Sequence, residues 1–289
     1  MDEEQVGREG FAFEGDWRDY APIAFTNLLL TIVTLGFYRF WATTRTRRYL
    51  WANTRFIDDR LEWTGTGMEL FIGFLMVILL IGLPFLFIQF GAQALILQGH
   101  GGIAAILTFV AFFTIFYMVG LARFRALRYR LSRTWWHGIR GGSDDAGWSY
   151  GISYIWKSFV GTLAAGLMIP WSMMSLWNER WNKMSFGPHM FESAGEHGQT
   201  MKRFLLFYLL PIALFALIGV RIARRGEPSA DFFMEIFILG IGFYLLLGLV
   251  ALAFYAKFFR VAVDGLSLAG LNFHFYAKTR EWICCSWVT

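Results

Sequence analysis

Arginines interleaved with aromatic side chains in residues 39–55 are the groups best suited to bind a ligand. Arg45 and Arg48 lie three residues apart, and the row continues through Ala52 to Arg55, so a helix would place it along one face. Arginine clusters beside a membrane segment attract acidic lipid with about 1 kcal/mol each, and Trp and Tyr prefer the same interface. The stretch predicts binding of anionic headgroups or of a specific anionic ligand, and topology anchoring is the simpler interpretation. The candidate residues are Arg45, Arg47, Arg48 and Arg55.

A second basic run covers residues 123–133 and directly follows an apolar segment. Its arginines are spaced by two, three, two and three residues. Such a run beside a transmembrane helix is typical of a cytoplasmic loop. A phosphate or phospholipid site is the alternative interpretation.

No set of residues has the spacing of an enzyme site. The histidines do not form the His-Glu-x-x-His pattern, and the adjacent Cys284 and Cys285 have no metal-ligand spacing to a partner. Gly65-Thr66-Gly67 lacks the third glycine of a dinucleotide loop, and neither a Gly-Lys-Ser/Thr phosphate loop nor a Gly-x-Ser-x-Gly elbow is present. We therefore expect no enzyme activity, no metal and no cofactor.

Three carboxylates, those of Glu62, Glu192 and Glu235, could relay protons or bind cations. Glu62 and Glu192 occupy equivalent positions of an internal repeat, and Glu235 lies at the start of an apolar segment. Each lies near a segment end, where solvation or helix capping is the commoner role.

Composition and hydropathy identify the elements that carry these groups. Hydrophobic residues make up 56% of the 289 residues and charged ones 16%, whereas soluble domains have roughly 45–50% and about 25%. About 20 apolar residues carry a helix across the hydrocarbon core. Residues 70–98, 101–122 and 236–256 reach that length, and residues 204–220 are shorter and contain Pro211. The sequence predicts an all-α polytopic membrane protein with four transmembrane helices.

The formal charge of +5 fits the same class of protein. In a membrane protein cationic residues usually mark cytoplasmic loops, so we expect no nucleic-acid partner. The acidic residues 1–10 lack the basic region, apolar stretch and cleavage site of a secretory signal, and we expect nothing to be removed there.

Internal similarity divides the chain into two tandem repeats. At an offset of 130 residues, Gly36 aligns with Gly166, Trp41 with Trp171, and Asn27 with Lys157. A third copy begins at an offset of 132 from the second. The predicted parts are an acidic tail (1–10), membrane repeat 1 (11–122), membrane repeat 2 (123–258) and the start of a truncated third repeat (259–289). Each repeat has a short β-like lead-in, a short apolar segment and a transmembrane hairpin, and the lead-ins at 11–14 and 271–275 alternate as strands do.

The short apolar segments, residues 21–38 and 158–171, either cross the membrane or return to the side they enter. If both crossed, about 10 Lys and Arg would lie on one side and 15 on the other. If both return, only Arg221, Arg224 and Arg225 of the 26 lie outside, which leaves 23 inside and fits the positive-inside tendency. Lys157 also cannot cheaply occupy the bilayer centre. We expect re-entrant segments; interfacial segments or ordinary short spans with a snorkelling lysine are the alternative.

Two functional hypotheses follow from this organisation. Short, interrupted apolar segments at equivalent places of two halves are typical of transporter binding sites. The first hypothesis is therefore a transport-type protein with an unknown solute. The second is a non-transporting membrane component that binds anionic lipid or a partner protein, including a second copy, through its Arg- and Trp-rich cytoplasmic loops. The pathway candidates are Asn27, Gly36, Trp41, Lys157, Gly166, Pro170 and Trp171.

Several motifs resemble the YjgN-like family of bacterial inner-membrane proteins, domain of unknown function 898. They are the Phe-x-Phe-x-Gly lead-in at residues 11–15, the Asn-Leu-Leu-Leu-Thr-Ile-Val-Thr-Leu-Gly segment at 27–36, Arg-Arg-Tyr-Leu-Trp at 47–51 and Thr-Gly-Thr-Gly-x-Glu-Leu-Phe at 64–71. The resemblance implies a multi-pass bacterial inner-membrane protein, and it implies no activity. Family members would continue past Trp282 with a further Thr-Leu-Gly segment, so we expect a truncated or frameshifted end here.

Overall fold

The structure is a computed structural model that describes residues 10–225 and 230–279. It divides into two compact units. Unit 1 comprises residues 1–155 and 184–189, and unit 2 comprises residues 156–183 and 190–289. Cys284, Cys285 and the end of the predicted third repeat lie outside the described residues.

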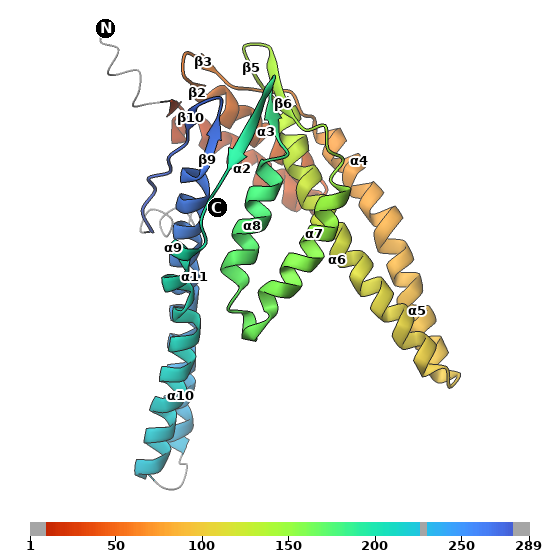
Figure 1. The fold of residues 1–289 in the computed structure, drawn as a ribbon, viewed down its shortest axis with the longest axis vertical. Coiled ribbons are helices and arrows are strands. Elements are labelled where there is room, and N and C mark those ends of the chain that lie inside the picture. The colour runs from red at the N-terminus through yellow and green to blue at the C-terminus, as the bar shows by residue number, and fades with distance from the viewer. Residues whose placement is uncertain (1–9, 226–229, 280–289) are drawn as a thin grey trace. The chain divides into compact units, whose positions relative to one another are not determined.

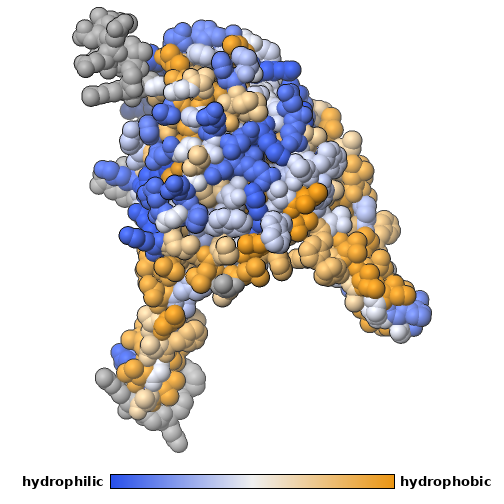
Figure 2. Space-filling model, viewed as in Figure 1, coloured by the Kyte–Doolittle hydropathy of each residue, from blue (hydrophilic) through white to orange (hydrophobic). Residues whose placement is uncertain are grey.

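Most of the chain is helical, and four helices are long and apolar enough to cross a membrane, which confirms the prediction (Figure 1). In unit 1 the first combines α4 (Gly67–Val77), the π-helix η1 (Ile78–Gly82) and α5 (Leu83–Leu97), and the second is α6 (Gly101–Ser132). In unit 2 the third combines α9 (Gly198–Phe204) with α10 (Leu206–Arg225), and the fourth is α11 (Ala230–Asp264). Hydrophobic residues cover these helices within each unit (Figure 2).

Proline residues lie within two of the long helices. Pro84 lies just after the π-helical turn η1. A proline has no backbone N–H to bond to the carbonyl four residues earlier, and the wider turn of a π-helix accommodates this missing hydrogen bond. Pro211 lies inside α10 without ending it, and a single turn residue, Leu205, separates α9 from α10.

The first short apolar segment forms a helical hairpin in unit 1. Helix α2 (Trp17–Val33) is followed by a turn and then by α3 (Arg39–Ala52), which packs back against α2. The turn reverses the chain because Leu35 and Gly36 both have positive φ, 50° and 91°. We call residues 17–52 the first hairpin.

The second short segment has the same local structure. Helix α7 (Trp148–Thr162) begins in unit 1 and continues into unit 2, where η2 (Ala164–Gly166) and α8 (Ile169–Trp181) follow. Ala165 and Gly166 have φ of 58° and 88°. We call residues 156–181, all in unit 2, the second hairpin.

Short antiparallel strands form between the helices, mostly where the sequence had indicated only polar and aromatic stretches. In unit 1, β1 (Phe11–Phe13), β2 (Thr54–Phe56) and β3 (Asp59–Arg60) pair in that order. Also in unit 1, β4 (Glu62–Trp63) pairs with β5 (Thr134–Trp136), β5 with β6 (Ile139–Gly142) and β6 with β7 (Ser185–Phe186). In unit 2, β8 (His189–Ser193, apart from its first residue), β9 (Leu266–Leu268) and β10 (Leu271–Asn272) pair in that order.

The predicted lead-in strands are confirmed at residues 11–13 but shorter than expected near the end. Strand β10 stops at Asn272, and Phe275 donates its backbone N–H to the Asp264 carboxylate instead of to a strand partner. Two of the hairpin turns have positive φ at both central residues, His137-Gly138 and Ala269-Gly270, the geometry of a two-residue turn that matches the strand twist.

The core of unit 2 lies between α8, α11 and the loop before α9. Met174 packs with Phe258, Val261 and Ala262 in one buried cluster. At the edge of this core, the backbone at Gly265 lies directly against the backbone at Gly195. A Cβ at Gly265 would lie only 2.6 Å from the Gly195 nitrogen.

We expect Gly265→Ala to lower the free energy of unfolding by about 1–3 kcal/mol, because the facing group is backbone and cannot move aside. Chemical denaturation in detergent measures this. Gly248→Ala on α11 is the matched control, since its Cβ would meet nothing within 4 Å and we expect no loss of stability. Equal stability of the two variants would contradict the prediction.

Candidate functional site

Asn27, the first pathway candidate, lies inside the first hairpin. Its side chain is buried, with 7% exposed, and Nδ2 donates to the Ala42 carbonyl at 3.3 Å and to the Thr46 hydroxyl at 3.4 Å. Both partners belong to α3, so the amide joins the two helices of the hairpin.

Lys157, which the predicted repeat aligns with Asn27, forms an ion pair across the second hairpin. Its Nζ lies 2.6 Å from Glu179 Oε2, and the two side chains are only 19% and 20% exposed. Nζ also donates to the Ser175 carbonyl at 3.5 Å, and Lys183 Nζ lies 4.0 Å from the other Glu179 oxygen. The sequence interpretation missed Glu179, because only the reversal at Gly166 brings α8 alongside α7.

The glycine and proline candidates shape the turns. Gly36 and Gly166 supply positive φ, and Pro170 is buried at the first turn of α8, where its missing N–H costs nothing. In unit 2 the Tyr208 hydroxyl donates to the Ala165 carbonyl at 2.6 Å, which holds that turn against α10.

The tryptophan candidates pack within their own units. Trp41 on α3 is half-buried against Phe71 of α4, with ring centroids 5.8 Å apart, and a Cβ at Gly67 would lie 2.7 Å from its ring. Trp171 is half-buried on α8. The pathway candidates are therefore spread over two units, and their polar groups bond within their own hairpins. This arrangement gives the transport hypothesis no support.

The predicted arginine row is broken by the end of α3, so the expectation that Arg55 shares its helical face is wrong. The helix ends at Ala52, where the Asn53 side chain donates to the Tyr49 carbonyl at 2.9 Å. Arg55 lies instead in β2, with Nε 3.4 Å from Glu14 Oε1. The ion pair thus connects β2 to Glu14, the residue directly after β1.

The three candidate arginines on α3, which are Arg45, Arg47 and Arg48, differ in their surroundings. Arg47 is half-buried, with its guanidinium 5.0 Å from the Trp63 ring centroid. Burial, followed by the charge of Arg130, lowers the pKa of Arg47 below its usual value. Arg45 and Arg48 are exposed, and neither side chain bonds to any residue that the structure describes. Of the four predicted lipid or anion candidates, these two therefore have charges that are available to an external anion.

The Glu69 carboxylate, which the sequence interpretation missed, connects α4 to the end of α6. Glu69 Oε1 lies 2.8 Å from Arg133 Nη2, and Oε2 accepts from the Tyr129 hydroxyl at 2.9 Å. Thr66 and Glu69 also form a capping box at the start of α4. The signal was present, because a Thr three residues before a Glu at the edge of an apolar run is typical of such a cap.

A titratable pair joins two turns in unit 1. His137 Nε2 lies 3.0 Å from Asp58 Oδ1, and His137 Nδ1 lies 3.9 Å from Asp59 Oδ2. The hydrogen bond to Asp58 is the largest cause that raises the pKa of His137 above 6.5, and the same bond lowers the pKa of Asp58 below 3.8. Among the described residues no group of three or more His, Cys, Asp and Glu could hold a metal ion.

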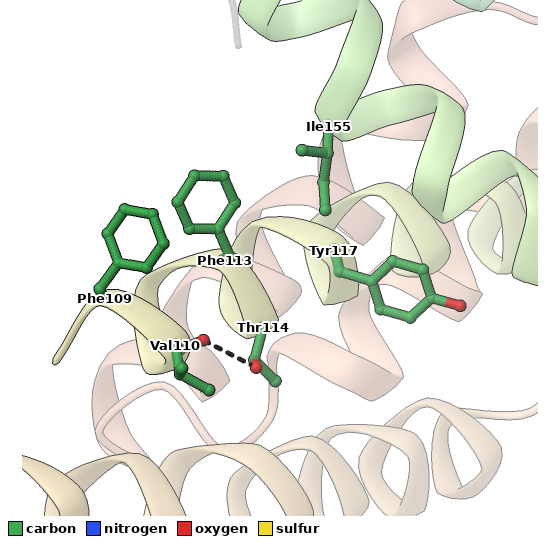
Figure 3. Close-up of a pocket in the computed structure, with 6 residues that line it drawn as sticks. All are labelled: Phe109, Val110, Phe113, Thr114, Tyr117 and Ile155. Carbon is green, nitrogen blue, oxygen red and sulfur yellow. Dashed lines mark hydrogen bonds between the residues drawn. The ribbon is translucent and has the colours of Figure 1, made fainter. Parts of the chain in front are cut away.

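An apolar hollow of about 340 Å³ lies along the membrane-crossing part of α6 (Figure 3). Phe109, Phe113 and Tyr117 line it from α6, and Ile155 lines it from α7. Its surroundings in a bilayer are acyl chains, so its apolar lining requires no specific ligand.

Comparisons with known proteins agree with this architecture. A sequence model of the family described as "Bacterial protein of unknown function (DUF898)" matches residues 8–288. The Salmonella typhimurium LT2 protein "Inner membrane protein YjgN" is 29% identical over 129 residues, which cover 43% of this chain and 33% of that protein. The Escherichia coli O157:H7 protein of the same name is 29% identical over 140 residues, which cover 48% and 32%. No solved structure matches the chain.

The four apolar helices, together with relatives named as inner-membrane proteins, define a multi-pass protein of the bacterial inner membrane. Within that class, the chain belongs to the DUF898 family, as the motif resemblance indicated. The match spans about a third of the length of these curated relatives.

Removing one partner of the Lys157–Glu179 pair leaves a charge in a mostly buried site. We expect Lys157→Met to lower the free energy of unfolding, and the double variant Lys157→Met/Glu179→Leu to recover part of the loss, with a coupling of about 1–3 kcal/mol. The free energies of unfolding of the wild type, the single variants and the double variant, measured in mixed micelles, form a double-mutant cycle that gives the coupling. Lys183→Met, which removes a charge 4.0 Å from the same carboxylate, is the control and loses less. Additive single effects would show that the pair is not coupled.

The His137–Asp58 pair predicts a specific pH dependence. Because the pKa of His137 is raised, its contribution to stability is fully present below about pH 6.5 and is lost as the pH rises through the raised pKa. Because the pKa of Asp58 is lowered, its contribution is lost as the pH falls below 3.8 through the lowered pKa. We expect Asp58→Asn to move the His137 midpoint down towards 6.5, measured by NMR of labelled histidine in nanodiscs. Asp59→Asn, at the longer distance, should move it less. An unchanged midpoint in Asp58→Asn would rule out the pair.

Proposed function

We propose that this protein is a non-catalytic membrane component that binds anionic lipid at the cytoplasmic face, through Arg45 and Arg48 beside a shallowly inserted helical hairpin. The observation that carries the proposal is the exposure of these two guanidinium groups without any bonding partner among the described residues. They lie three residues apart on α3, so one headgroup layer is within reach of both.

The tip of the first hairpin supports insertion into the bilayer. Val33, Leu35 and Phe37 are 77%, 91% and 61% exposed at the turn. Burying apolar surface is worth about 25 cal/mol per Å², so this tip gains by leaving water. Because α3 folds back on α2, the chain returns to the side from which it entered.

Charge limits how deep each hairpin goes. Arg39 is the first residue of α3 and lies next to the tip of the first hairpin, so that tip stays within about one helical turn, roughly 5 Å, of the headgroups. The second hairpin has no charged residue between Lys157 and Glu179. Its turn lies roughly 10–15 Å beyond that ion pair, close to the roughly 15 Å depth of one leaflet's hydrocarbon.

The same features support the proposed duplication. The positive-φ pairs at Leu35-Gly36 and at Ala165-Gly166 are separated by the 130 residues that align the two sequences, and polar side chains join the two helices at equivalent positions, Asn27 and Lys157. We propose two re-entrant copies of one hairpin, and a partner protein or a second copy as a further binding partner of the exposed loops.

Sidedness and depth test the hairpins. In a chain without Cys284 and Cys285, single cysteines at Gly10 and Asn53 should both react with an impermeant maleimide from the cytoplasmic side only. Spin labels at Leu35 and Leu167 should both collide with oxygen, and the label at Leu167 should be the deeper. Labelling of Gly10 and Asn53 from opposite sides, or a water-exposed Leu167, would contradict the re-entrant hairpins.

Lipid selectivity tests the arginines. We expect Arg45→Gln/Arg48→Gln to weaken the preference for phosphatidylglycerol over phosphatidylcholine by about 1 kcal/mol for each arginine. Spin-labelled lipids in reconstituted membranes measure the preference, and added salt should reduce it. Arg224→Gln/Arg225→Gln removes two charges beyond the other end of the membrane helices and is the control. An equal loss in both variants, or no loss, would contradict the proposed lipid site.

A further inference from the structure

A polar cavity of about 570 Å³ lies in unit 1 beside the last residues of α6. Its size is within the range of roughly 300–1,000 Å³ that small-molecule sites occupy. Ser132, which lines it, is also the last residue of α6, so the cavity lies at the end of this helix that carries the basic residues. Its walls come from α6, β6 and β7, with Arg128, Arg140, Ser143, Asp144 and Ser185 among the lining residues.

Glycines create the space. A Cβ at Gly141 would lie 3.0 Å from Leu131 Cβ, so a glycine there lets β6 lie directly on α6. A Cβ at the next residue, Gly142, would meet nothing within 4 Å, because that position faces the open cavity. The strand thus contacts the helix at one residue and leaves room beside it at the next.

Two guanidinium groups, those of Arg128 and Arg140, line this space, and neither is ion-paired with a carboxylate among the residues that the structure describes. Arg128 is half-buried and Arg140 exposed, and neither side chain bonds to a residue in the described part of the chain. Arg133, the residue directly after α6, is by contrast paired with Glu69 at 2.8 Å. A planar guanidinium binds phosphate oxygens in a bidentate manner, and two of them can share one phosphate.

The Asp144 carboxylate restricts which ligands can bind in the cavity. Its carboxylate lines the same cavity and repels a bare phosphate, and the C-terminal end of α6 adds partial negative charge. A carboxylate accepts hydrogen bonds from hydroxyl groups, however. We infer that the cavity binds a phosphate ester with free hydroxyl groups, with Arg128 and Arg140 on the phosphate and Asp144 on a hydroxyl.

Such a group occurs in a soluble glycerol phosphate and in the headgroup of phosphatidylglycerol, and two arms of one experiment separate these sources. In the first, glycerol 3-phosphate and inorganic phosphate are titrated by calorimetry into the protein in phosphatidylcholine nanodiscs. In the second, mass spectrometry measures the phosphatidylglycerol that stays bound after exchange into neutral detergent. Saturable binding in the first arm identifies a soluble ligand, and retention in the second without binding in the first identifies a lipid.

The variants test whether the cavity is responsible in either arm. We expect Arg128→Gln/Arg140→Gln to weaken binding at least about tenfold, since charge-assisted hydrogen bonds are lost. Gly142→Leu should do the same by filling the space without changing charge, and unchanged unfolding midpoints of both variants exclude misfolding. Asp144→Asn should strengthen inorganic phosphate binding and reduce the preference for glycerol 3-phosphate.

Arg45→Gln/Arg48→Gln separates this inference from the proposed function, because it removes the same charge from α3 and leaves the cavity intact. It should weaken general selectivity for anionic lipid while cavity binding stays unchanged. Absence of binding in both arms, or equal binding by wild type and Arg128→Gln/Arg140→Gln, overturns the inference. Neither result would alter the lipid selectivity expected of the first hairpin.

Discussion

Exclusion of unpaired charge from hydrocarbon limits how deep each apolar segment of this chain can lie. The four long helices have windows with almost no charge and are long enough to cross. The first hairpin carries Arg39 next to its tip, whereas the second is uncharged from residue 158 to residue 178 and has Lys157 bonded to Glu179 at its base. The same constraint explains why Asn27 bonds within its hairpin, because a polar group away from water needs a partner.

The functional value of each arginine depends on what it contacts. Arg47 stacks on Trp63, Arg55 pairs with Glu14 and Arg133 pairs with Glu69, so these three arginines hold elements of unit 1 together. The other arginines that concern binding are Arg45, Arg48 and Arg128 of these basic runs and Arg140 of β6, and they have no such partner among the described residues. A positive-inside count treats all of them alike, although only the unpaired ones can neutralise an external anion.

The two hairpins are more similar in the backbone geometry of their turns than in their side chains. Asn27 and Lys157 differ in charge, and Leu35 and Ala165 differ in size, yet both hairpins reverse through a positive-φ residue followed by a glycine. A reversal of this kind needs a backbone that tolerates the left-handed region, which glycine supplies. The side chains around it remain free to vary in chemistry.

The sequence by itself determined the four transmembrane helices, the first lead-in strand and the family, because hydropathy, alternation and motifs are properties of neighbouring residues. Tertiary structure decided which charges are bonded. Glu179 lies 22 residues from Lys157 and Glu69 lies 64 from Arg133, and their pairing requires helices to fold back on one another. The strands other than β1 and β10 were equally hidden, since segments of two to five residues carry too little periodicity to be recognised until a partner strand supplies the hydrogen bonds.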